Sequence, residues 1–162
     1  MASSVFPAPS AGGKTMFRTS LTSGTSWTVP AGVTYVNVTL VGGGGGGSGY
    51  GNNSDSPGWQ GLGGQIVEST FTTTPGASIS YSIGAGGTGG ASSQPHNGGT
   101  GGSTTMTGAT TAAGGGGAIR NYGTTGNAGQ AGLVSNNGGQ PQNWTSYGGA
   151  GGAGCIVIEY WV

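Results

Sequence analysis

Charged residues are scarce in this sequence. Three basic and three acidic residues are spread over 162 positions, and the formal net charge is zero. A nucleic-acid-binding protein needs clustered lysine and arginine to displace counterions from phosphates, and three scattered cations cannot do this. A charge-driven disordered tail is excluded as well, because such segments carry high net charge. The composition therefore predicts no nucleic-acid partner.

Cysteine and long apolar runs are also rare. The single cysteine, Cys155, excludes an intrachain disulfide framework, and its place at the start of an apolar block predicts a buried, inert thiol. No apolar run approaches the ~18 residues of a membrane-spanning helix, so we expect no membrane insertion. Residues 1–10 contain no basic residue and are interrupted by Pro7 and Pro9, so we expect no signal peptide.

Groups suited to catalysis or metal binding are few and far apart. One histidine, His96, and three separated acids form no recognisable catalytic triad, and no His, Cys, Asp and Glu residues cluster as metal ligands would. Residues 8–15 and 84–89 match relaxed nucleotide-binding patterns, but no helix-forming sequence follows either of them. The sequence therefore predicts a protein that is not an enzyme, with no catalytic residue, cofactor or metal.

Glycine, by contrast, is abundant: there are 42, and with serine and threonine they make up half of the chain. The apolar and β-branched residues gather in short blocks with the composition of strands. No block has an apolar period of 3.6 residues, so we expect almost no helix. The blocks predict an all-β fold, an antiparallel, jelly-roll-like β-sandwich. They comprise residues 16–22, 25–29, 33–41, 65–74, 77–83, 103–111 and 155–162.

Alternation within the blocks predicts which side chains face the core. In residues 33–41, we expect Val36, Val38 and Leu40 to face the core. Val33, Tyr35 and Val41 should lie on the other face of that strand. Tight turns at residues 30–32 and 75–76 should separate neighbouring strands. The expected core positions are Val36, Val38, Leu40, Ile79, Tyr81, Ile83, Ile156, Ile158, Tyr160 and Val162.

Three long glycine-rich stretches lie between the blocks, at residues 42–64, 84–102 and 112–154. Structureless loops of that length are uncommon in a compact domain, and ordering glycine costs roughly 0.5–1 kcal/mol per residue relative to alanine. A three-residue period, that of polyproline II, lets extended backbones pack nearly in contact. We therefore predict a polyglycine-II-like bundle above the sandwich; a flexible Gly/Ser linker is the alternative. The repeating glycines are 84, 87, 90, 123, 126, 129, 132, 148, 151 and 154.

Aromatic residues occur within these stretches beside polar ones. A glycine bundle is too thin to bury large rings, so several rings should lie at its surface or tips. Tyr, Trp, Ser, Gly and Asn are typical of binding loops held by a firm base. The alternative is that the rings merely cap and cover the bundle. The candidates for binding a receptor are Tyr50, Trp59, Tyr122, Trp144, Tyr147 and Asn143.

Three segments follow one another in an order typical of a known family. They are residues 27–42 (WTVPAGVTYVNVTLVG) with five further glycines, residues 81–87 (YSIGAGG) and residues 151–160 (GGAGCIVIEY). This order resembles the glycine-rich domains of tailed-bacteriophage proteins. The resemblance implies a non-enzymatic virion surface protein, foremost a tail-fibre or tail-tip receptor-binding module. Its partners would be a host saccharide or outer-membrane protein.

The resemblance also implies an organisation of the chain. Residues 1–23 would form an attachment segment and first strand, and residues 24–162 the glycine-rich domain. The protein would be made in the bacterial cytoplasm and lie on the phage tail or capsid exterior, and trimers are common on phage fibres. The alternatives are a capsid decoration or head-fibre protein and a polyglycine-II ice-binding protein. An extended N-terminal segment could dock on another virion protein, although a frayed terminus is the alternative. The docking residues would be Val5, Phe6, Pro7 and Pro9.

Overall fold

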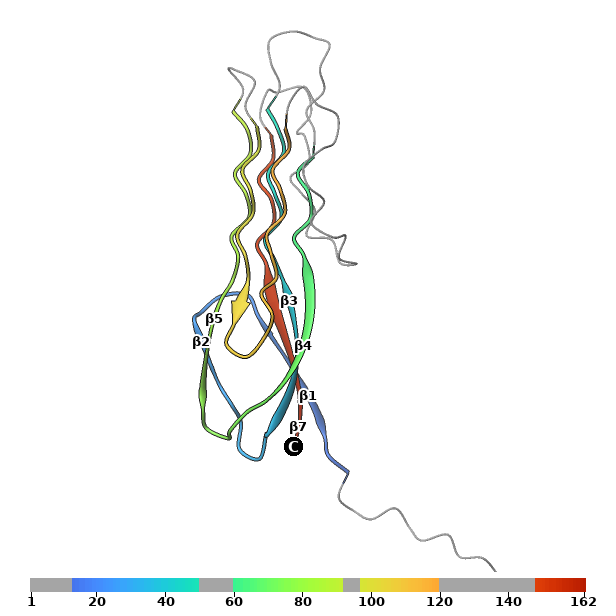
Figure 1. The fold of residues 1–162 in the computed structure, drawn as a ribbon, viewed down its shortest axis with the longest axis vertical. Helices are drawn as coiled ribbons and strands as arrows, with labels where there is room; N and C mark the ends of the chain where they lie inside the picture. The colour runs from blue at the N-terminus through green and yellow to red at the C-terminus, as the bar shows by residue number, and fades with distance from the viewer. Residues whose placement is uncertain (1–12, 50–59, 92–96, 120–147) are drawn as a thin grey trace, which may run out of the picture.

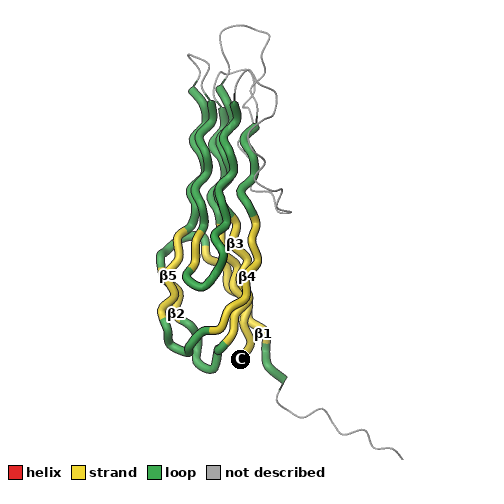
Figure 2. Tube along the Cα trace, viewed as in Figure 1, coloured by secondary structure: helices red, strands yellow, loops and turns green. Residues whose placement is uncertain are grey.

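The computed structural model describes residues 13–49, 60–91, 97–119 and 148–162. This part of the chain forms a β-sandwich at one end and a bundle of extended segments at the other (Figures 1 and 2). Strands, turns and extended segments account for all described residues, and none of these is helical. The predicted all-β class is therefore confirmed.

The sandwich consists of two antiparallel sheets. The four-stranded sheet has the order β1-β7-β3-β4, with β1 at Met16–Leu21, β7 at Cys155–Trp161, β3 at Tyr35–Val41 and β4 at Ile66–Thr72. The three-stranded sheet has the order β2-β5-β6, with β2 at Ser26–Thr28, β5 at Ser78–Ser82 and β6 at Thr105–Met106. Each predicted block thus contains one strand.

The sixth block, residues 103–111, is the one that departs most from its prediction. Its strand, β6, has two residues because the chain turns directly after Met106, where the Ala109 amide donates back to the Met106 carbonyl over 3.0 Å. Gly108 makes this turn with a φ of +92°, a conformation that L side chains rarely adopt. The expected turns at residues 30–32 and 75–76 are confirmed: Gly32 and Gly76 have φ values of +80° and +79°.

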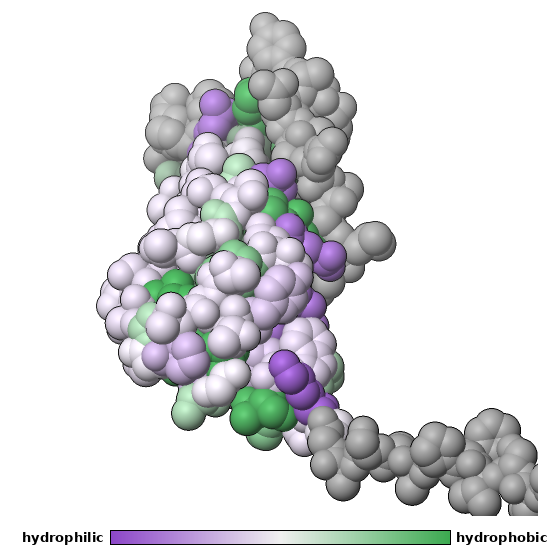
Figure 3. Space-filling view, turned by 60° about the horizontal axis from the view of Figure 1, so that its bottom comes forward, coloured by the Kyte–Doolittle hydropathy of each residue, from purple (hydrophilic) through white to green (hydrophobic). Residues whose placement is uncertain are grey.

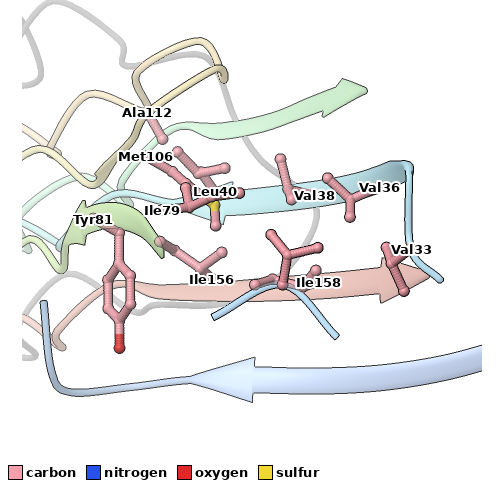
Figure 4. Packing of buried hydrophobic residues seen from close by; sticks show 11 residues of the cluster. Val33, Val36, Val38, Leu40, Ile79, Tyr81, Met106, Ala112, Ile156 and Ile158 are labelled. Carbon is pink, nitrogen blue, oxygen red and sulfur yellow. The ribbon is translucent and has the colours of Figure 1, made fainter. Parts of the chain in front are cut away.

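The core lies between the two sheets (Figure 4). Alternation along β3, β5 and β7 places their apolar residues on the inner faces, as predicted. Ile83 and Tyr160 are partly buried and pack against this cluster. The buried cluster comprises Val29, Val33, Val36, Val38, Leu40, Ile79, Tyr81, Met106, Ala112, Ile156 and Ile158.

Three expectations about burial are wrong. Val33 is fully buried in the core, because β3 begins only at Tyr35 and the strand's alternation does not extend to Val33. Val162 is 52% exposed, because β7 ends at Trp161. Cys155 is half-buried rather than buried, since the inward position of Ile156 directs Cys155 to the opposite face of β7.

The bundle is built around one central segment, residues 42–49, which continues from β3. Three successive central amides donate to three different neighbours: Gly42 to Gln65, Gly43 to Gly102 and Gly44 to Gly152, over 2.8–2.9 Å. The next three amides repeat the rotation, at the carbonyls of Leu62, Gly99 and Gly149. The direction in which the central amides donate thus repeats after three residues, as in the threefold helix of polyglycine II. The predicted bundle is therefore confirmed for the described segments.

Two further segments donate to the central one. Gly87 and Gly90 donate to the carbonyls of Gly44 and Gly47, and Gly115 and Ala118 donate to those of Gly43 and Gly46. Hydrogen bonds also join the outer segments to one another. Around the central segment, the order of the five ring segments is 60–65, 113–119, 97–102, 84–91 and 148–154.

Burial follows the same three-residue period. Every residue of the central segment is buried, and an unbroken glycine run from Gly42 to Gly47 leaves room for neighbours on all sides. Ring segments 84–91, 97–102 and 148–154 expose one residue in three, and that position is where their side chains occur. The pattern Gly-Gly-x is therefore typical of these three ring segments. Examples of the exposed position are Ala85, Thr88, Ala91, Thr100, Ala150 and Ala153.

Thr104 joins the sandwich to the bundle. Its side chain is fully buried, and its hydroxyl donates to the Val41 carbonyl over 2.6 Å while accepting from the Gly84 amide over 3.0 Å. Val41 ends β3 and Gly84 begins a ring segment, so one hydroxyl links the last strand residue of the central chain to a neighbouring ring segment.

We predict that Gly45→Ala and Gly116→Ala have very different effects, although the two glycines lie close together in the bundle. A Cβ at Gly45 would overlap the carbonyl oxygen of Gly116, whereas a Cβ at Gly116 would meet only Leu62 Cδ1 at 3.6 Å, an ordinary contact. Gly45→Ala should lower the free energy of unfolding by about 1–3 kcal/mol or more. Gly116→Ala should be neutral or stabilising by up to about 1 kcal/mol. Urea denaturation of both variants measures this, and equal effects would contradict the tight packing.

We predict that Thr104→Val lowers the free energy of unfolding by about 1–3 kcal/mol, because the shape is kept while a buried amide and a buried carbonyl lose their partner. Thr105→Val is the matched control: its hydroxyl bonds to Ser82 Oγ at an exposed position, where water can replace it. Thermal denaturation followed by circular dichroism gives both values. A Thr105 variant as destabilised as the Thr104 variant would show that strand packing, not the junction bonds, is responsible.

Candidate binding surface

The end of the bundle away from the sandwich, here called the distal end, collects the ends of six segments (Figure 2). The described chain stops there at Gly49, Ala91 and Ile119 and resumes at Gln60, Asn97 and Gly148. Hydrogen bonds near these ends fix their relative positions. Gly148 donates to the Gly90 carbonyl over 2.8 Å, and Gly98 donates to that of Ala118 over 2.8 Å.

The predicted receptor-binding residues belong to two of the three stretches that leave and re-enter the described chain at the distal end, residues 50–59 and 120–147. All six lie outside the described residues, so their side-chain positions stay predictions. What the structure adds is the position of their anchors, because both ends of each stretch are bonded into the bundle. The six are Tyr50, Trp59, Tyr122, Asn143, Trp144 and Tyr147.

The opposite end, here called the base, is where the described chain begins. The Thr15 amide donates to the Val162 carbonyl over 2.8 Å, and the Val162 amide donates to the Thr15 carbonyl over 3.0 Å. From Thr15 the chain enters β1, the edge strand next to β7. The predicted attachment residues Val5, Phe6, Pro7 and Pro9 precede this point and lie outside the described residues.

The base carries an apolar surface that the sequence reasoning missed. Met16 is 55% exposed, Tyr35 46% and Val162 52%. The strand register places Met16 opposite Trp161, with Tyr35 on the far side of Trp161 across the sheet. Figure 3 shows hydrophobic surface at this end of the molecule. The signal in the sequence was weak, because these residues lie at strand ends, where alternation stops indicating burial.

A small surface pocket opens beside this apolar surface. Its volume is about 140 Å³, and Lys14, Thr34, Tyr35 and Trp161 line it. Pockets for drug-sized ligands usually begin at roughly 300 Å³, so this one is too small to enclose such a molecule. We therefore treat the base as a contact surface rather than as a ligand site.

Charge is confined to the sandwich in the part of the chain that the structure describes. Lys14, Arg18, Glu68 and Glu159 are all there, and the described bundle segments carry no charged side chain. Arg18 Nε and Glu159 Oε1 lie 3.6 Å apart across β1 and β7, an exposed pair of small energetic value. The described part of the bundle is therefore electrically neutral and offers hydrogen bonds and small side chains.

The described residues contain neither a metal-ligand cluster nor a membrane-spanning helix. No group of three or more His, Cys, Asp or Glu side chains is placed to hold a metal ion there. No helix long and apolar enough to cross a membrane occurs in these ranges. Residues 84–89, which match a nucleotide-binding pattern, form a ring segment of the bundle, and no helix follows in the described residues.

Comparison with known proteins agrees with this architecture. A search of curated proteins gives no match. A family model described as a glycine-rich domain matches residues 19–154, from within β1 to the residue before β7. The match covers most of the chain and both parts of the structure, and the protein therefore belongs to the family of glycine-rich domains.

Proposed function

We propose that this protein is a non-enzymatic surface component of a bacteriophage virion, in which the distal end binds the host cell and the base attaches to the particle. One observation carries the proposal. All three stretches outside the described part of the bundle begin and end at the distal end, on segments joined by backbone hydrogen bonds. A receptor-binding module of a tail fibre or tail tip needs such a separation of display and attachment.

The bundle suits the display of binding residues. Ordering loops during binding reduces affinity, and anchoring both ends of each loop beforehand lowers that cost. The described bundle is neutral, and Asp55 and Arg120 are the only two residues of formal charge in the three stretches, so recognition would depend mainly on aromatic and amide side chains. Tyr, Trp and Asn supply apolar contact area and hydrogen bonds, which fits a saccharide or a neutral protein surface.

The base suits attachment to another virion protein. It exposes Met16, Tyr35 and Val162 to water. Covering these side chains with a partner would remove apolar surface from water, which favours association. The segment with Val5, Phe6, Pro7 and Pro9 precedes the described chain at this same end. An extended peptide and an apolar surface side by side could form one continuous interface, with the peptide added to a partner's sheet edge or groove.

Ice binding is a second candidate, and one feature favours it. The neighbouring segments 84–91 and 97–102 expose small residues every third position, which corresponds to about 9 Å along a polyglycine-II helix. The exposed residues Ala85, Thr88, Ala91 and Thr100 in these rows are small and uncharged. We expect no thermal hysteresis from the purified protein, measured by nanolitre osmometry, because the rows are short. A freezing-point gap comparable to that of known antifreeze proteins would favour ice binding instead.

We predict that replacing Trp59, Trp144 and Tyr147 together by alanine abolishes adsorption to host cells. The loss should be at least tenfold, because aromatic residues dominate the energy of binding surfaces. The melting temperature should change by less than about 2 °C, since the bundle is held by backbone bonds. Fluorescently labelled protein is incubated with a panel of bacterial strains, and cell-bound fluorescence is counted. The matched control is Tyr35→Ala, which removes an exposed aromatic ring at the base and should leave adsorption unchanged.

Three results would contradict the proposal. Adsorption that survives the triple substitution would remove the distal aromatics from recognition. A loss of adsorption in the Tyr35 variant alone would assign recognition to the base. A labelled C-terminus found on the capsid of intact virions by negative-stain imaging would favour a capsid decoration or head-fibre protein.

A further inference from the structure

Strand β1 is an open edge of the four-stranded sheet. It pairs with β7 on one side, and no described strand pairs with it on the other. The backbones of Thr15 and Val162 exchange both of their hydrogen bonds, over 2.8 and 3.0 Å. Because bonded pairs alternate along an antiparallel ladder, the amides and carbonyls of Met16, Arg18 and Ser20 point away from β7. These backbone groups are available to an added strand.

The other described edges are less suited to strand addition. β2 has three residues and β6 has two, which limits the number of bonds that either could form. A turn contacts β4: the Thr110 amide donates to Ser69 Oγ over 3.1 Å, and a Cβ on Gly108 would meet the Phe71 ring at 2.8 Å. Natural edge strands are often protected by covering loops, proline or bulges. β1 contains no proline and no bulge, since its six residues pair with β7 in unbroken register.

Both faces of β1 expose a large apolar side chain near the base. Phe17 is 45% exposed, although it stacks on Tyr160 on the inner face of the sheet with ring centroids 5.6 Å apart. Met16, 55% exposed, lies on the outer face by alternation. A strand laid along β1 would cover part of both side chains with its own alternating residues. The open backbone and the exposed side chains therefore fit the same kind of partner.

Charge indicates the chemistry of that partner. Lys14 and Arg18 lie on the outer face on either side of Met16, and Lys14 lines the pocket that also includes Trp161. Arg18 is paired with Glu159, and Lys14 forms no ion pair with any described residue. Two positive charges against one negative charge at this edge complement an acidic strand.

A second copy of this chain complements the edge poorly. Two antiparallel β1 strands joined through all their outward-facing positions would place Met16 opposite Ser20, and Arg18 opposite Arg18 of the other copy. A shift of two residues in either direction moves the two arginines only to diagonal positions. Like charges opposite each other destabilise a strand pair, and long side chains still reach diagonal neighbours. No acidic residue of the other β1 would meet either arginine.

We propose that the edge of β1 binds an extended segment of a partner protein that carries acidic residues opposite Lys14 and Arg18 and an apolar residue opposite Met16. The segment adds antiparallel to β1, as all the described strand pairs of the sandwich are antiparallel. Main-chain hydrogen bonds supply affinity, and the alternating side chains supply specificity. The inference rests on the proposed attachment of the base for the partner's place on a virion, whereas strand addition can be measured without it.

A synthetic peptide with blocked ends and the sequence Thr-Glu-Val-Ile-Val-Glu-Thr is the probe. It is titrated into the ¹⁵N-labelled full chain, and amide exchange is followed by NMR. At saturation the Met16 and Arg18 amides should exchange at least about tenfold more slowly, because the peptide carbonyls accept from them. The Phe17 and Thr19 amides belong to the pairs bonded to β7, so their exchange should change by less than about twofold.

Charge variants test the predicted chemistry. A probe with lysine in place of both glutamates should bind at least about tenfold more weakly, because like charges then face each other. Lys14→Gln should weaken binding of the acidic probe by about two- to fivefold, the range expected for one cross-strand charge pair. Thr70→Glu is the matched control: it changes the net charge of the protein by the same amount at an exposed position on β4, and it should leave the affinity unchanged.

Several results would overturn the proposal. They are unchanged exchange at Met16 and Arg18 with the acidic probe at the highest concentration, equal affinity for the two probes, or equal effects of the Lys14 and Thr70 substitutions. Slow exchange at Met16 and Arg18 without any peptide, together with a dimer in sedimentation velocity, would assign the edge to a second copy and also overturn it. Host adsorption is measured separately, so a failure here leaves the proposed recognition at the distal end unaffected.

Discussion

The structure depends on how closely one backbone can approach another when no Cβ stands between them. In the bundle, carbonyl oxygens occupy the places where side chains would begin: a Cβ on Gly43 would overlap the Ala85 carbonyl, and one on Gly46 the Thr88 carbonyl. That proximity lets neighbouring segments form backbone hydrogen bonds of 2.7–2.9 Å in three directions. In a β-sheet the bonds of a strand lie in one plane, whereas here each central residue joins different segments. Order in the bundle is therefore shared by all six described segments.

The β-sandwich supplies what polyglycine lacks, a defined register. A slip of three residues along a glycine helix restores the same set of backbone bonds, so the bundle alone does not select one alignment. Strands do, because a slip by one residue would turn every inward side chain outward. Leu40 faces Ile156 and Val38 faces Ile158 across β3 and β7, and both strands continue directly into bundle segments. Side-chain packing in the β-sandwich thus fixes the register of the backbones in the bundle.

Much of this architecture could be predicted from the sequence, because two periods are visible in it. Alternation located the strands and most of the core, and the three-residue glycine repeat predicted the bundle. The central segment could also have been identified, because its unbroken run from Gly42 to Gly47 is the longest glycine run in the sequence. The burial of Val33 and the exposure of Val162 depend on where strands end. The two-residue length of β6 depends on the turn at Gly108, and no periodicity encodes these boundaries. The predicted binding residues lie outside the described chain, so their mutual arrangement stays a prediction.

The shortest and the longest of the stretches at the distal end fit the order of segments around the bundle. Residues 92–96 connect segments 84–91 and 97–102, which are hydrogen-bonded neighbours, so a short link suffices. Residues 50–59 connect the central segment to a ring segment beside it. Residues 120–147, the longest stretch, connect segments 113–119 and 148–154, which share no hydrogen bond in the described structure. Backbone bonding thus sets where each stretch must start and finish.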